Sequence, residues 1–422
     1  MKDCKPIINR HLHTLCSDIG SRPIGTLNNH KAETYISKAF EELGFQVERQ
    51  EYACKSWECN RAELFLGDEK ISVIASTYSS SCEIEASFAA AGNVFELENR
   101  NFRGKIAVIY GELTQATLAA KHCSVYNPET HKRIVGLLEA KEPLAIVAVS
   151  HRMFDPVPIL EDWNFKIPSV TVSTIDGMKL LRNEERSIRL TLKTKFDASH
   201  AANVIGKYGK NGKERLVFCA HIDTKYGTDG AADNGAGVIV LLTVAELLKD
   251  RLENKTLPFD FEFVAFNGEE YYALGEMLYI EKNLQNFGNM LAAINIDGIG
   301  HYSSTSNLAF FDCPEELVNA ALDVKEKYLG VIRVDPWPAG DHIHFWMRKV
   351  PSIAIGSTGT YDLFHTAEDM IDLISIDKIE EVVKLVVDLV IHIIADRLEN
   401  EEKSCKESKQ HNTASTTGIS DI

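Results

Sequence analysis

The sequence lacks a long hydrophobic run and any excess of positive charge. Nowhere do 18 apolar residues follow one another, so we expect no transmembrane helix and no membrane partner. The N-terminal segment MKDCKPIINRHLHTLCSDIG has neither the apolar core nor the small-residue cleavage site of a secretory signal. Lys and Arg number 45 against 61 Asp and Glu, a formal net charge of −16. Because so acidic a surface repels phosphate backbones, nucleic acid is not an expected partner.

Cysteine is present without an organised pattern. The nine cysteines are scattered, their number is odd, and no metal-type pairing recurs. We therefore expect a reduced, cytoplasmic location. Hydrophobic residues make up 45% of the 422 residues, which excludes a disordered or fibrous chain and indicates about two to three globular domains.

The pattern of apolar residues and turn residues changes along the chain. Residues 1–56 hold a helical pattern followed by an alternating strand, and residues 57–197 hold short β-like runs separated by Gly and Pro, typical of a β-rich second domain. Residues 198–398 alternate strand and helix, which predicts an α/β domain with a mostly parallel central sheet and helices on both faces. Residues 399–422 are polar, and we expect them to be disordered.

Residues able to bind metal follow the ends of four predicted strands in the third segment. Because the carboxyl ends of parallel strands share one edge of a sheet, we expect these side chains to meet there. They are His221, Asp223, Asp233, Glu269, Glu270, Asp297 and His365.

This set of side chains points to hydrolysis. Two imidazoles and three carboxylates suit Zn²⁺, with Mn²⁺ or Co²⁺ as alternatives. Five ligands and a spare glutamate predict two ions bridged by one carboxylate. The spare glutamate would take a proton from the activated water and pass it to a leaving amine, which is the chemistry of amide hydrolysis.

Four blocks carry a resemblance to a known family. HIDTKYGTDGAADNGAGV, FVAFNGEE, NIDGIG and YDLFHTAED are similar to the signature blocks of the dizinc aminopeptidases of clan MH, which include bacterial leucyl aminopeptidases and glutamate carboxypeptidase-like zinc exopeptidases. The resemblance extends from His11 to about Lys55 and from Ala198 to about Arg397. It implies a phosphorylase/hydrolase-like α/β fold and a peptide substrate.

The resemblance also implies roles for single residues. His221 and Asp297 would bind one zinc ion, Glu270 and His365 the other, and Asp233 would bridge them. Glu269 would be the general base, and Asp223 would orient the imidazole of His221. In such enzymes the peptide bond between Asp233 and Asn234 is cis.

The region before the first metal histidine resembles a different module. NFRGKIAVIYG, LLEAKEPLAIVAV and KIPSVTVSTIDGMKLL are similar to parts of a protease-associated (PA) domain. The resemblance implies an inserted PA-like domain over residues 57–197 that caps or shapes the entrance to the active site.

One residue departs from the family pattern. Family members often have Tyr before the last metal histidine, where it donates a hydrogen bond to the developing oxyanion, but here that residue is Phe364. Losing one such donor costs roughly 100- to 1000-fold in rate. Tyr361 is a possible substitute, although a plain loop tyrosine is the simpler interpretation.

Several other residues have two open interpretations. Asp341, His342 and His344 either support the site from behind or are plain loop residues. Pocket lining and core packing are equally open for four aromatic side chains, which are Trp337, Trp346, Tyr271 and Tyr272.

We expect a zinc exopeptidase, most simply an aminopeptidase. A carboxypeptidase or dipeptidase is the alternative within the enzyme class, and it would need an arginine for the substrate carboxylate; Arg333 and Arg348 are the candidates, and neither lies in a clear motif. A glutaminyl cyclase relative is less favoured, since those enzymes use one zinc ion. A catalytically inactive relative that serves as a binding or scaffold protein is the alternative outside the enzyme class.

Overall fold

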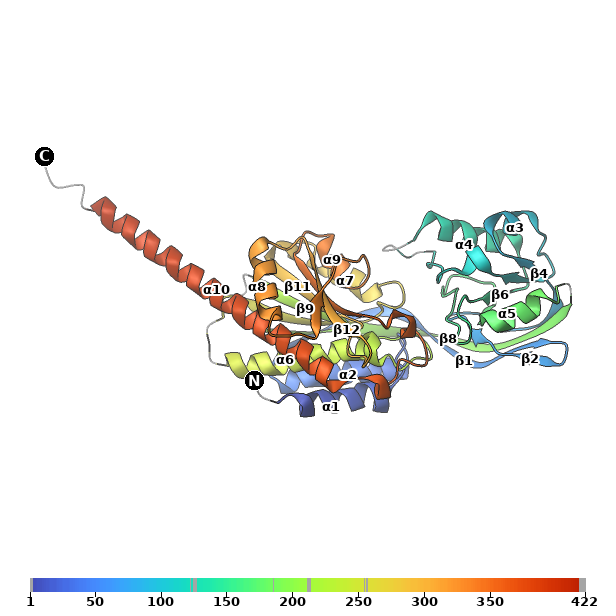
Figure 1. The fold of residues 1–422 in the computed structure, drawn as a ribbon, viewed down its shortest axis with the longest axis horizontal. Helices are drawn as coiled ribbons and strands as arrows, with labels where there is room; N and C mark the ends of the chain where they lie inside the picture. The colour runs from blue at the N-terminus through green and yellow to red at the C-terminus, as the bar shows by residue number, and fades with distance from the viewer. Residues whose placement is uncertain are drawn as a thin grey trace.

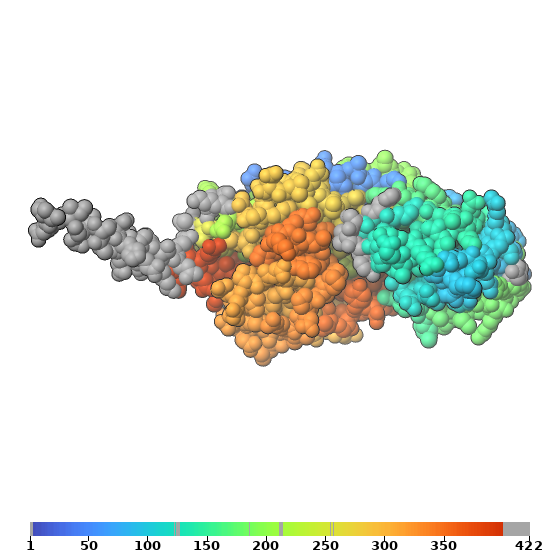
Figure 2. Space-filling view, turned by 90° about the horizontal axis from the view of Figure 1, so that it is seen from above, coloured from blue at the N-terminus to red at the C-terminus, as the bar shows by residue number. Residues whose placement is uncertain are grey.

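The computed structural model describes residues 3–416, apart from 122, 124–126, 185, 211–213, 254 and 256. The chain forms two lobes that lie side by side (Figures 1 and 2). We call the lobe that contains both the beginning and the end of the described chain the large lobe. The outer lobe consists of the chain between the middle of strand β1 (Gln46–Leu66) and the middle of strand β8 (Ser187–Tyr208).

Strands β1 and β8 form a two-stranded antiparallel ribbon that runs through both lobes (Figure 1). The first part of β8 pairs with β4 (Cys82–Ala91) of the outer lobe, and its last part pairs with β10 (Asp260–Phe266) of the large lobe. The two lobes therefore share one hydrogen-bonded series of strands. The boundaries expected at 56/57 and 197/198 both fall inside these strands, so no linker separates the lobes, and the division into domains stays a prediction.

The sheet of the large lobe has the strand order β13-β12-β14-β11-β9-β10-β8. Its four central strands are parallel to one another. Besides β8 and β10, the strands are β9 (Arg215–His221), β11 (Met290–Ile296), β12 (Thr305–Phe311), β13 (Val331–Arg333) and β14 (Ser352–Thr358). β12 is antiparallel to β14, so the sheet is mixed but mostly parallel.

Helices cover both faces of this sheet (Figure 1). One face packs against α1 (Lys5–His13), α2 (Leu27–Glu42), α6 (Ala236–Leu252), α8 (Glu315–Lys325) and α10 (Ile376–Thr416). The other face packs against α7 (Leu274–Asn283) and α9 (His342–Trp346). The expected α/β class, with a mostly parallel sheet between two helical layers, is confirmed.

Helix α6 lies at the centre of the larger helical layer. Among the described residues, Ala231–Leu252 is the one helical stretch long and apolar enough to cross a membrane, with a mean hydropathy of 1.5. Of its most apolar 18 residues, 94% are buried inside the protein. The apolar character of this helix is therefore accounted for by the protein core.

The outer lobe is a small parallel sheet between two apolar cores. Four strands lie side by side and pair in parallel in the order β4, β5 (Ile106–Ile109), β6 (Ala145–Val149) and β7 (Ser169–Val172). The lobe also holds β2 (Glu69–Ile71), β3 (Ile74–Ala75), α3 (Val94–Asn99), α4 (Glu129–Lys141) and α5 (Thr174–Leu181). The expectation of many short strands in this region agrees with these elements.

The C-terminal segment differs from expectation. We expected disorder from residue 399, but α10 continues through this region to Thr416, and residues 417–422 lie outside the described residues. The segment between 399 and 416 is rich in Glu, Lys and Ser and contains neither Gly nor Pro. Glu and Lys favour helix, so a polar composition here extends the helix into solvent rather than ending it.

Candidate metal centre

The expected metal-binding residues meet at the carboxyl edge of the large-lobe sheet. His221 is the last residue of β9, Asp297 follows β11, and Glu270 follows β10. His365 lies in the loop after β14, and Asp233 lies in the turn that leads into α6. Four parallel strands and one helix start therefore bring these side chains to one place, as the strand pattern predicted.

The side chains form two groups that share one carboxylate. The Nε2 atom of His221 lies 3.1 Å from Oδ1 of Asp233 and 3.4 Å from Oδ1 of Asp297. The Nε2 atom of His365 lies 3.1 Å from Oδ2 of Asp233 and 3.2 Å from Oε2 of Glu270. Each group offers three ligand atoms within 4.8 Å of one another. The two oxygens of Asp233 thus face two different groups, which is the arrangement that a bridging ligand requires.

Two of the buried ligand atoms at this centre lack hydrogen-bond partners in the described chain, as expected for atoms that bind a cation. Nε2 of His221 and Oε1 of Glu270 are buried and have no hydrogen-bond partner among the described residues. Buried polar atoms are normally paired, so orphaned atoms at one site call for an explanation. A mixed set of imidazole and carboxylate donors fits Zn²⁺ and related divalent ions. The residues present therefore fit a pair of such cations.

Charge is concentrated at this centre. Burial raises the pKa of Glu269 well above 4.5, and the neighbouring carboxylates of Glu270, Asp341 and Asp297 raise it further. Burial disfavours a charged His221, but Asp297, Asp223 and Asp233 outweigh it and raise the pKa of this imidazole well above 6.5. A carboxylate with a raised pKa is a better proton acceptor, as a general base requires.

Asp223 holds the neighbouring loop rather than the imidazole alone. Its carboxylate accepts hydrogen bonds from the backbone N–H groups of Gly268, Glu269 and Glu270, at 2.7, 3.2 and 3.2 Å. Nδ1 of His221 lies 3.1 Å from the main-chain oxygen of Asp223 and 3.8 Å from its carboxylate. The expected orientation of His221 therefore comes mainly from the Asp223 main chain, and the carboxylate fixes the Glu269–Glu270 pair.

Two further residues shape the turn that carries Asp233. The carboxylate of Asp369 accepts hydrogen bonds from the backbone N–H groups of Ala232 and Asp233, at 2.7 and 3.0 Å. The fully buried Arg22 donates to the main-chain oxygens of Ile222 and Gly230, at 2.7 and 2.9 Å. Asp369 is the last residue of the HTAED block, so the sequence held a signal that could have identified it as part of the site. The sequence held no such signal for Arg22, because these two partners are about 200 residues away in sequence. The peptide bond between Asp233 and Asn234 is cis, as the resemblance implied.

The outer lobe reaches the centre through a buried ion pair. Nζ of Lys225 donates to Oε2 of Glu161, a residue of the outer lobe, and to the main-chain oxygen of Glu270, each at 2.8 Å. Glu161 also accepts a hydrogen bond from the Thr77 hydroxyl at 2.6 Å. Lys225 further lies 4.4 Å from the ring centroid of Tyr271. Sequence reasoning missed this pair, since no local pattern joins residues of two lobes.

A large cavity of about 630 Å³ opens beside the centre. Its wall includes Asp233, Glu269, Glu270 and Asp297, together with Asp335. Trp337, Tyr361 and Phe364 supply aromatic surface. No Lys or Arg lines this cavity within the part of the chain that the structure describes. The cavity is therefore acidic at its inner end and partly apolar along its wall.

The remaining candidates take different places. Tyr271 is buried, and its hydroxyl oxygen accepts a hydrogen bond from the backbone N–H of Tyr226 at 2.9 Å. Tyr272 stacks on Trp163 of the outer lobe, with ring centroids 4.2 Å apart. Trp346 packs in a small core cluster at Phe311. Of the four aromatic candidates, Trp337 is thus the one that lines the large cavity.

The DHIH segment lies behind the centre. Asp341 is buried, and burial together with the carboxylates of Asp297 and Asp223 raises its pKa to about 7. Nδ1 of His342 lies 3.4 Å from Nδ2 of Asn295, two residues before Asp297. His344 is buried and away from the ligand groups. Arg333 and Arg348 lie over the rings of Phe310 and Phe287, outside the cavity wall.

Comparison with known proteins agrees with this geometry. Residues 203–390 match the family model Peptidase family M28. Aminopeptidase YwaD of Bacillus subtilis is 24% identical over 99% of this chain and 91% of its own length. Carboxypeptidase Q of Xenopus laevis is 21% identical over 83% of this chain and 77% of its own length.

Solved structures share the fold. A zinc aminopeptidase from Bacillus subtilis matches with a TM-score of 0.73 at 20% identity, covering 92% of this chain and 95% of its own. An aminopeptidase from Aneurinibacillus sp. strain AM-1 matches with a TM-score of 0.71 at 18% identity, covering 92% and 93%. At this identity the likeness concerns the fold, and it extends over both lobes.

The fold, together with the imidazoles and carboxylates that meet at the carboxyl edge of the sheet, defines a metallopeptidase. Over residues 203–390 the chain is similar to peptidase family M28. The expected resemblance to clan MH is confirmed by this match, since the family is part of that clan.

Proposed function

We propose that this protein is a dizinc aminopeptidase that removes the N-terminal residue of peptides. The observation that carries the proposal is the charge of the large cavity's wall, where Glu269 and Asp335 bring carboxylates that are not assigned to metal and no Lys or Arg is present among the described lining residues. A free substrate ammonium is attracted to such a wall, whereas a substrate carboxylate is repelled. The names of the relatives add support, since three of the similar proteins are described as aminopeptidases and one of these three as a zinc enzyme.

The proposed ligand assignment follows the two groups of side chains. His221 and Asp297 would hold one zinc ion, Glu270 and His365 would hold the other, and Asp233 would contribute a carboxylate to both groups. Bound zinc supplies a Lewis acid that polarises the scissile carbonyl and lowers the pKa of water.

Glu269 is proposed to move the proton. Its carboxylate takes a proton from the attacking water and then gives that proton to the leaving amine. The hydrogen bonds from the backbone of residues 268–270 to Asp223 fix the position from which it acts. Burial raises the pKa of Glu269, which makes its carboxylate a better proton acceptor.

We also propose that the outer lobe is a PA-like domain and that the protein works in a reduced, cytoplasmic compartment. The parallel β4-β5-β6-β7 arrangement and the contacts with the metal centre support a role at the entrance of the site. The eight cysteines within the described side chains are all free, which supports a reducing compartment. Mn²⁺ or Co²⁺ in place of zinc stays an alternative for the ions.

The test combines metal content with a substrate panel. Aminoacyl-anilides with a free amine are compared with N-blocked peptides, and the Glu269→Gln variant is the matched control. We expect about two zinc ions per chain, turnover of the free-amine substrates alone, and a loss of kcat of at least about 100-fold in the variant with its metal retained. Absence of bound metal from protein purified without chelators would refute the proposal.

The second candidate is a carboxypeptidase or dipeptidase, favoured by the similarity to Carboxypeptidase Q. Cleavage of N-blocked peptides from the carboxyl end in the same panel would establish it. Metal binding without turnover of any substrate would instead favour an inactive relative that acts as a binding protein.

A further inference from the structure

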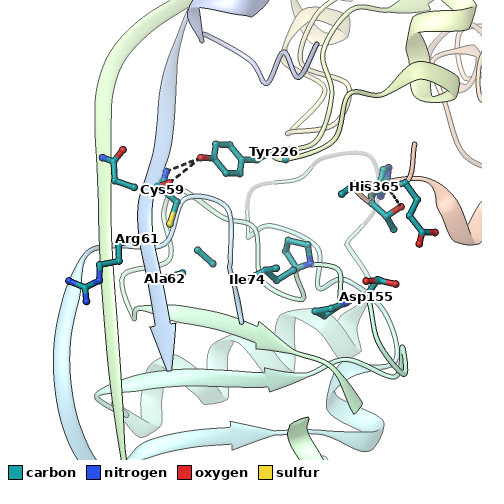
Figure 3. Close-up of a pocket in the computed structure, with 15 residues that line it drawn as sticks. Cys59, Arg61, Ala62, Ile74, Asp155, Tyr226 and His365 are labelled. Atoms are coloured by element: carbon teal, nitrogen blue, oxygen red, sulfur yellow. Dashed lines mark hydrogen bonds between the residues drawn. The ribbon is translucent and has the colours of Figure 1, made fainter. Parts of the chain in front are cut away.

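A second cavity of about 420 Å³ lies between the two lobes and reaches the candidate metal centre at His365. His365 lines both this cavity and the large one. In Figure 3, Cys59 and Tyr226 lie on one side of the cavity, His365 and Asp155 lie on the other, and Ile74 lies between them. The two cavities thus adjoin at the candidate metal centre.

We propose that this inter-lobe cavity binds the part of a peptide substrate that follows the cleaved bond. The proposal rests on the proposed aminopeptidase function. When the scissile carbonyl lies at the metal centre and the N-terminal residue occupies the large cavity, the rest of the peptide has to continue into space outside that cavity. The inter-lobe cavity adjoins the large cavity at His365 and offers such space.

The wall of the cavity suits a peptide chain. The outer lobe contributes apolar surface from Ile74, Ala75, Pro156 and Pro158. The large lobe contributes the backbone of Gly227 and the aromatic side chain of Tyr226, which is held in place by a hydrogen bond from Cys59 N to its hydroxyl at 3.1 Å. Apolar walls with a few polar groups are typical of pockets that bind ligands of this size.

A β-bulge in strand β1 opens toward the same space. The register between β1 and β8 shifts between Cys59 and Arg61, so Asn60 is the extra residue without a partner in β8. Asn60 is exposed and lines the cavity. Bulges interrupt the ladder and free main-chain groups, and they are common beside active sites. The strand therefore offers an unpaired backbone segment where an extended peptide would pass.

The charge of the wall narrows the class of substrate. Asp155 and Glu368 bring two carboxylates, whereas the guanidinium of Arg61 points away from the cavity (Figure 3) and is paired with Glu63 at 2.9 Å. A free terminal carboxylate inside the cavity is therefore disfavoured, and a basic side chain is favoured. The substrates we infer are peptides of at least three residues with a neutral or basic residue after the cleaved bond.

The test compares substrates that do and do not fill the cavity. The kcat/KM values are measured for an aminoacyl-anilide, a dipeptide and a tetrapeptide amide with the same N-terminal residue. We expect the wild-type protein to prefer the tetrapeptide amide over the dipeptide at least about tenfold, because binding of remote substrate parts raises the rate. Asn60→Trp should lower the ratio of tetrapeptide to anilide kcat/KM at least about tenfold.

The matched control is Glu85→Trp, an exposed position on β4 of the same lobe that does not line the cavity. It should leave the ratio at the wild-type value. Equal ratios in Asn60→Trp and wild-type protein would overturn the proposal.

A binding measurement separates this proposal from the catalytic one. Fluorescence anisotropy of a labelled tetrapeptide amide is recorded with metal-loaded Glu269→Gln protein, with and without Asn60→Trp. Weaker binding in the double variant supports the cavity assignment, even if the wild-type protein hydrolyses none of the substrates and the proposed activity fails. Equal binding with and without Asn60→Trp would overturn the cavity assignment while leaving aminopeptidase activity in place.

Charge is tested at Asp155. A tetrapeptide amide with Lys after the cleaved bond is compared with one that has Glu there. The preference for Lys should fall about twofold or more in Asp155→Asn, since an exposed carboxylate contributes a small attraction. An unchanged preference would remove Asp155 from the recognition of substrate.

Discussion

At the scale of single residues, Phe364 is the feature that departs from the family pattern. Its ring lies against the position that a Cβ atom on Gly298 would take, at 2.9 Å, so the side chain is packed beside Asp297. Tyr361 lines the same cavity, with its ring centroid 5.9 Å from that of Phe364. The residue Tyr361 is 78% exposed, so its hydroxyl is bathed in solvent.

This exposure leads to a prediction for Tyr361→Phe. We expect kcat to fall less than about threefold, because a solvent-exposed donor that is not held in place adds little to transition-state stabilisation, in contrast to the roughly 100-fold effect of a preorganised donor. Steady-state kinetics on an aminoacyl-anilide measures the difference. A loss of about 100-fold or more would instead identify Tyr361 as the oxyanion donor.

His11 gives a prediction for pH. Burial lowers its pKa to about 3, and its Nδ1 lies 2.6 Å from the Tyr35 hydroxyl. Between pH 6.5 and pH 3 the unfolded chain binds a proton at this site that the folded protein does not. Stability from this residue is therefore lost as the pH falls through that window, by up to about 2 kcal/mol between pH 7 and pH 5.

The measurement compares His11→Asn with the wild-type protein in urea at pH 7 and pH 5. The variant should be less stable at pH 7, since it loses the contact with Tyr35, but the wild-type protein should lose more stability on acidification. Parallel losses in the two proteins would refute the assignment.

At the scale of elements, the contact between the lobes depends on a few buried polar pairs. The side chains of Lys225 and Glu161 are 13% and 5% exposed, so the pair is largely shielded from water. Next to it, the Tyr272 hydroxyl donates to the carboxylate of Asp162 at 2.8 Å. These contacts join the outer lobe to the residues that immediately surround Glu270.

Removing one partner of the buried ion pair should lower the free energy of unfolding substantially. We expect Lys225→Met to destabilise the protein by about 3 kcal/mol, because it leaves the Glu161 carboxylate buried without a cation. The double variant Lys225→Met/Glu161→Gln should recover part of that loss, since the uncompensated charge is gone. The exposed pair of Lys132 and Glu129, 2.6 Å apart, is the control and should contribute less than about 1 kcal/mol.

Unfolding in urea measures each variant. Equal effects of the buried and the exposed pair would contradict the structural account of the lobe contact.

The sequence predicted the elements whose pattern is local. The apolar strands of the large lobe and the residues after them were found because buried parallel strands read as short apolar runs. The ribbon of β1 and β8 was recognised only in pieces, since much of it is exposed and its side chains alternate weakly between buried and exposed. Arg22, Glu161 and Lys225 were not found, because their partners are distant in sequence and no spacing rule connects them.

At the scale of the whole molecule, the metal centre concentrates like charges. Asp233, Glu269, Glu270 and Asp297 lie together, and the imidazoles of His221 and His365 can neutralise at most two of these four carboxylates. Cations that bind the folded protein relieve this repulsion. Binding to the folded state alone raises stability by mass action.

Removal of metal should therefore lower the Tm of the whole protein. We expect dialysis against a chelator to reduce Tm by at least a few degrees, and added Zn²⁺ to restore it. Asp233→Asn, which alters the carboxylate shared by both groups, should show a smaller shift between chelator and zinc. Differential scanning calorimetry measures the midpoints, and identical values with and without chelator in the wild-type protein would refute a stabilising metal site.

The continuous ribbon of β1 and β8 has a mechanical consequence for the space between the lobes. Lobes joined by two loops pivot about a few residues, but here both connections are hydrogen-bonded strands of 21 and 22 residues. Any widening of the inter-lobe cavity has to be distributed as small changes of twist along a paired ribbon. We therefore expect the width of the inter-lobe cavity to be set by the elasticity of this ribbon and not by a hinge at a few residues.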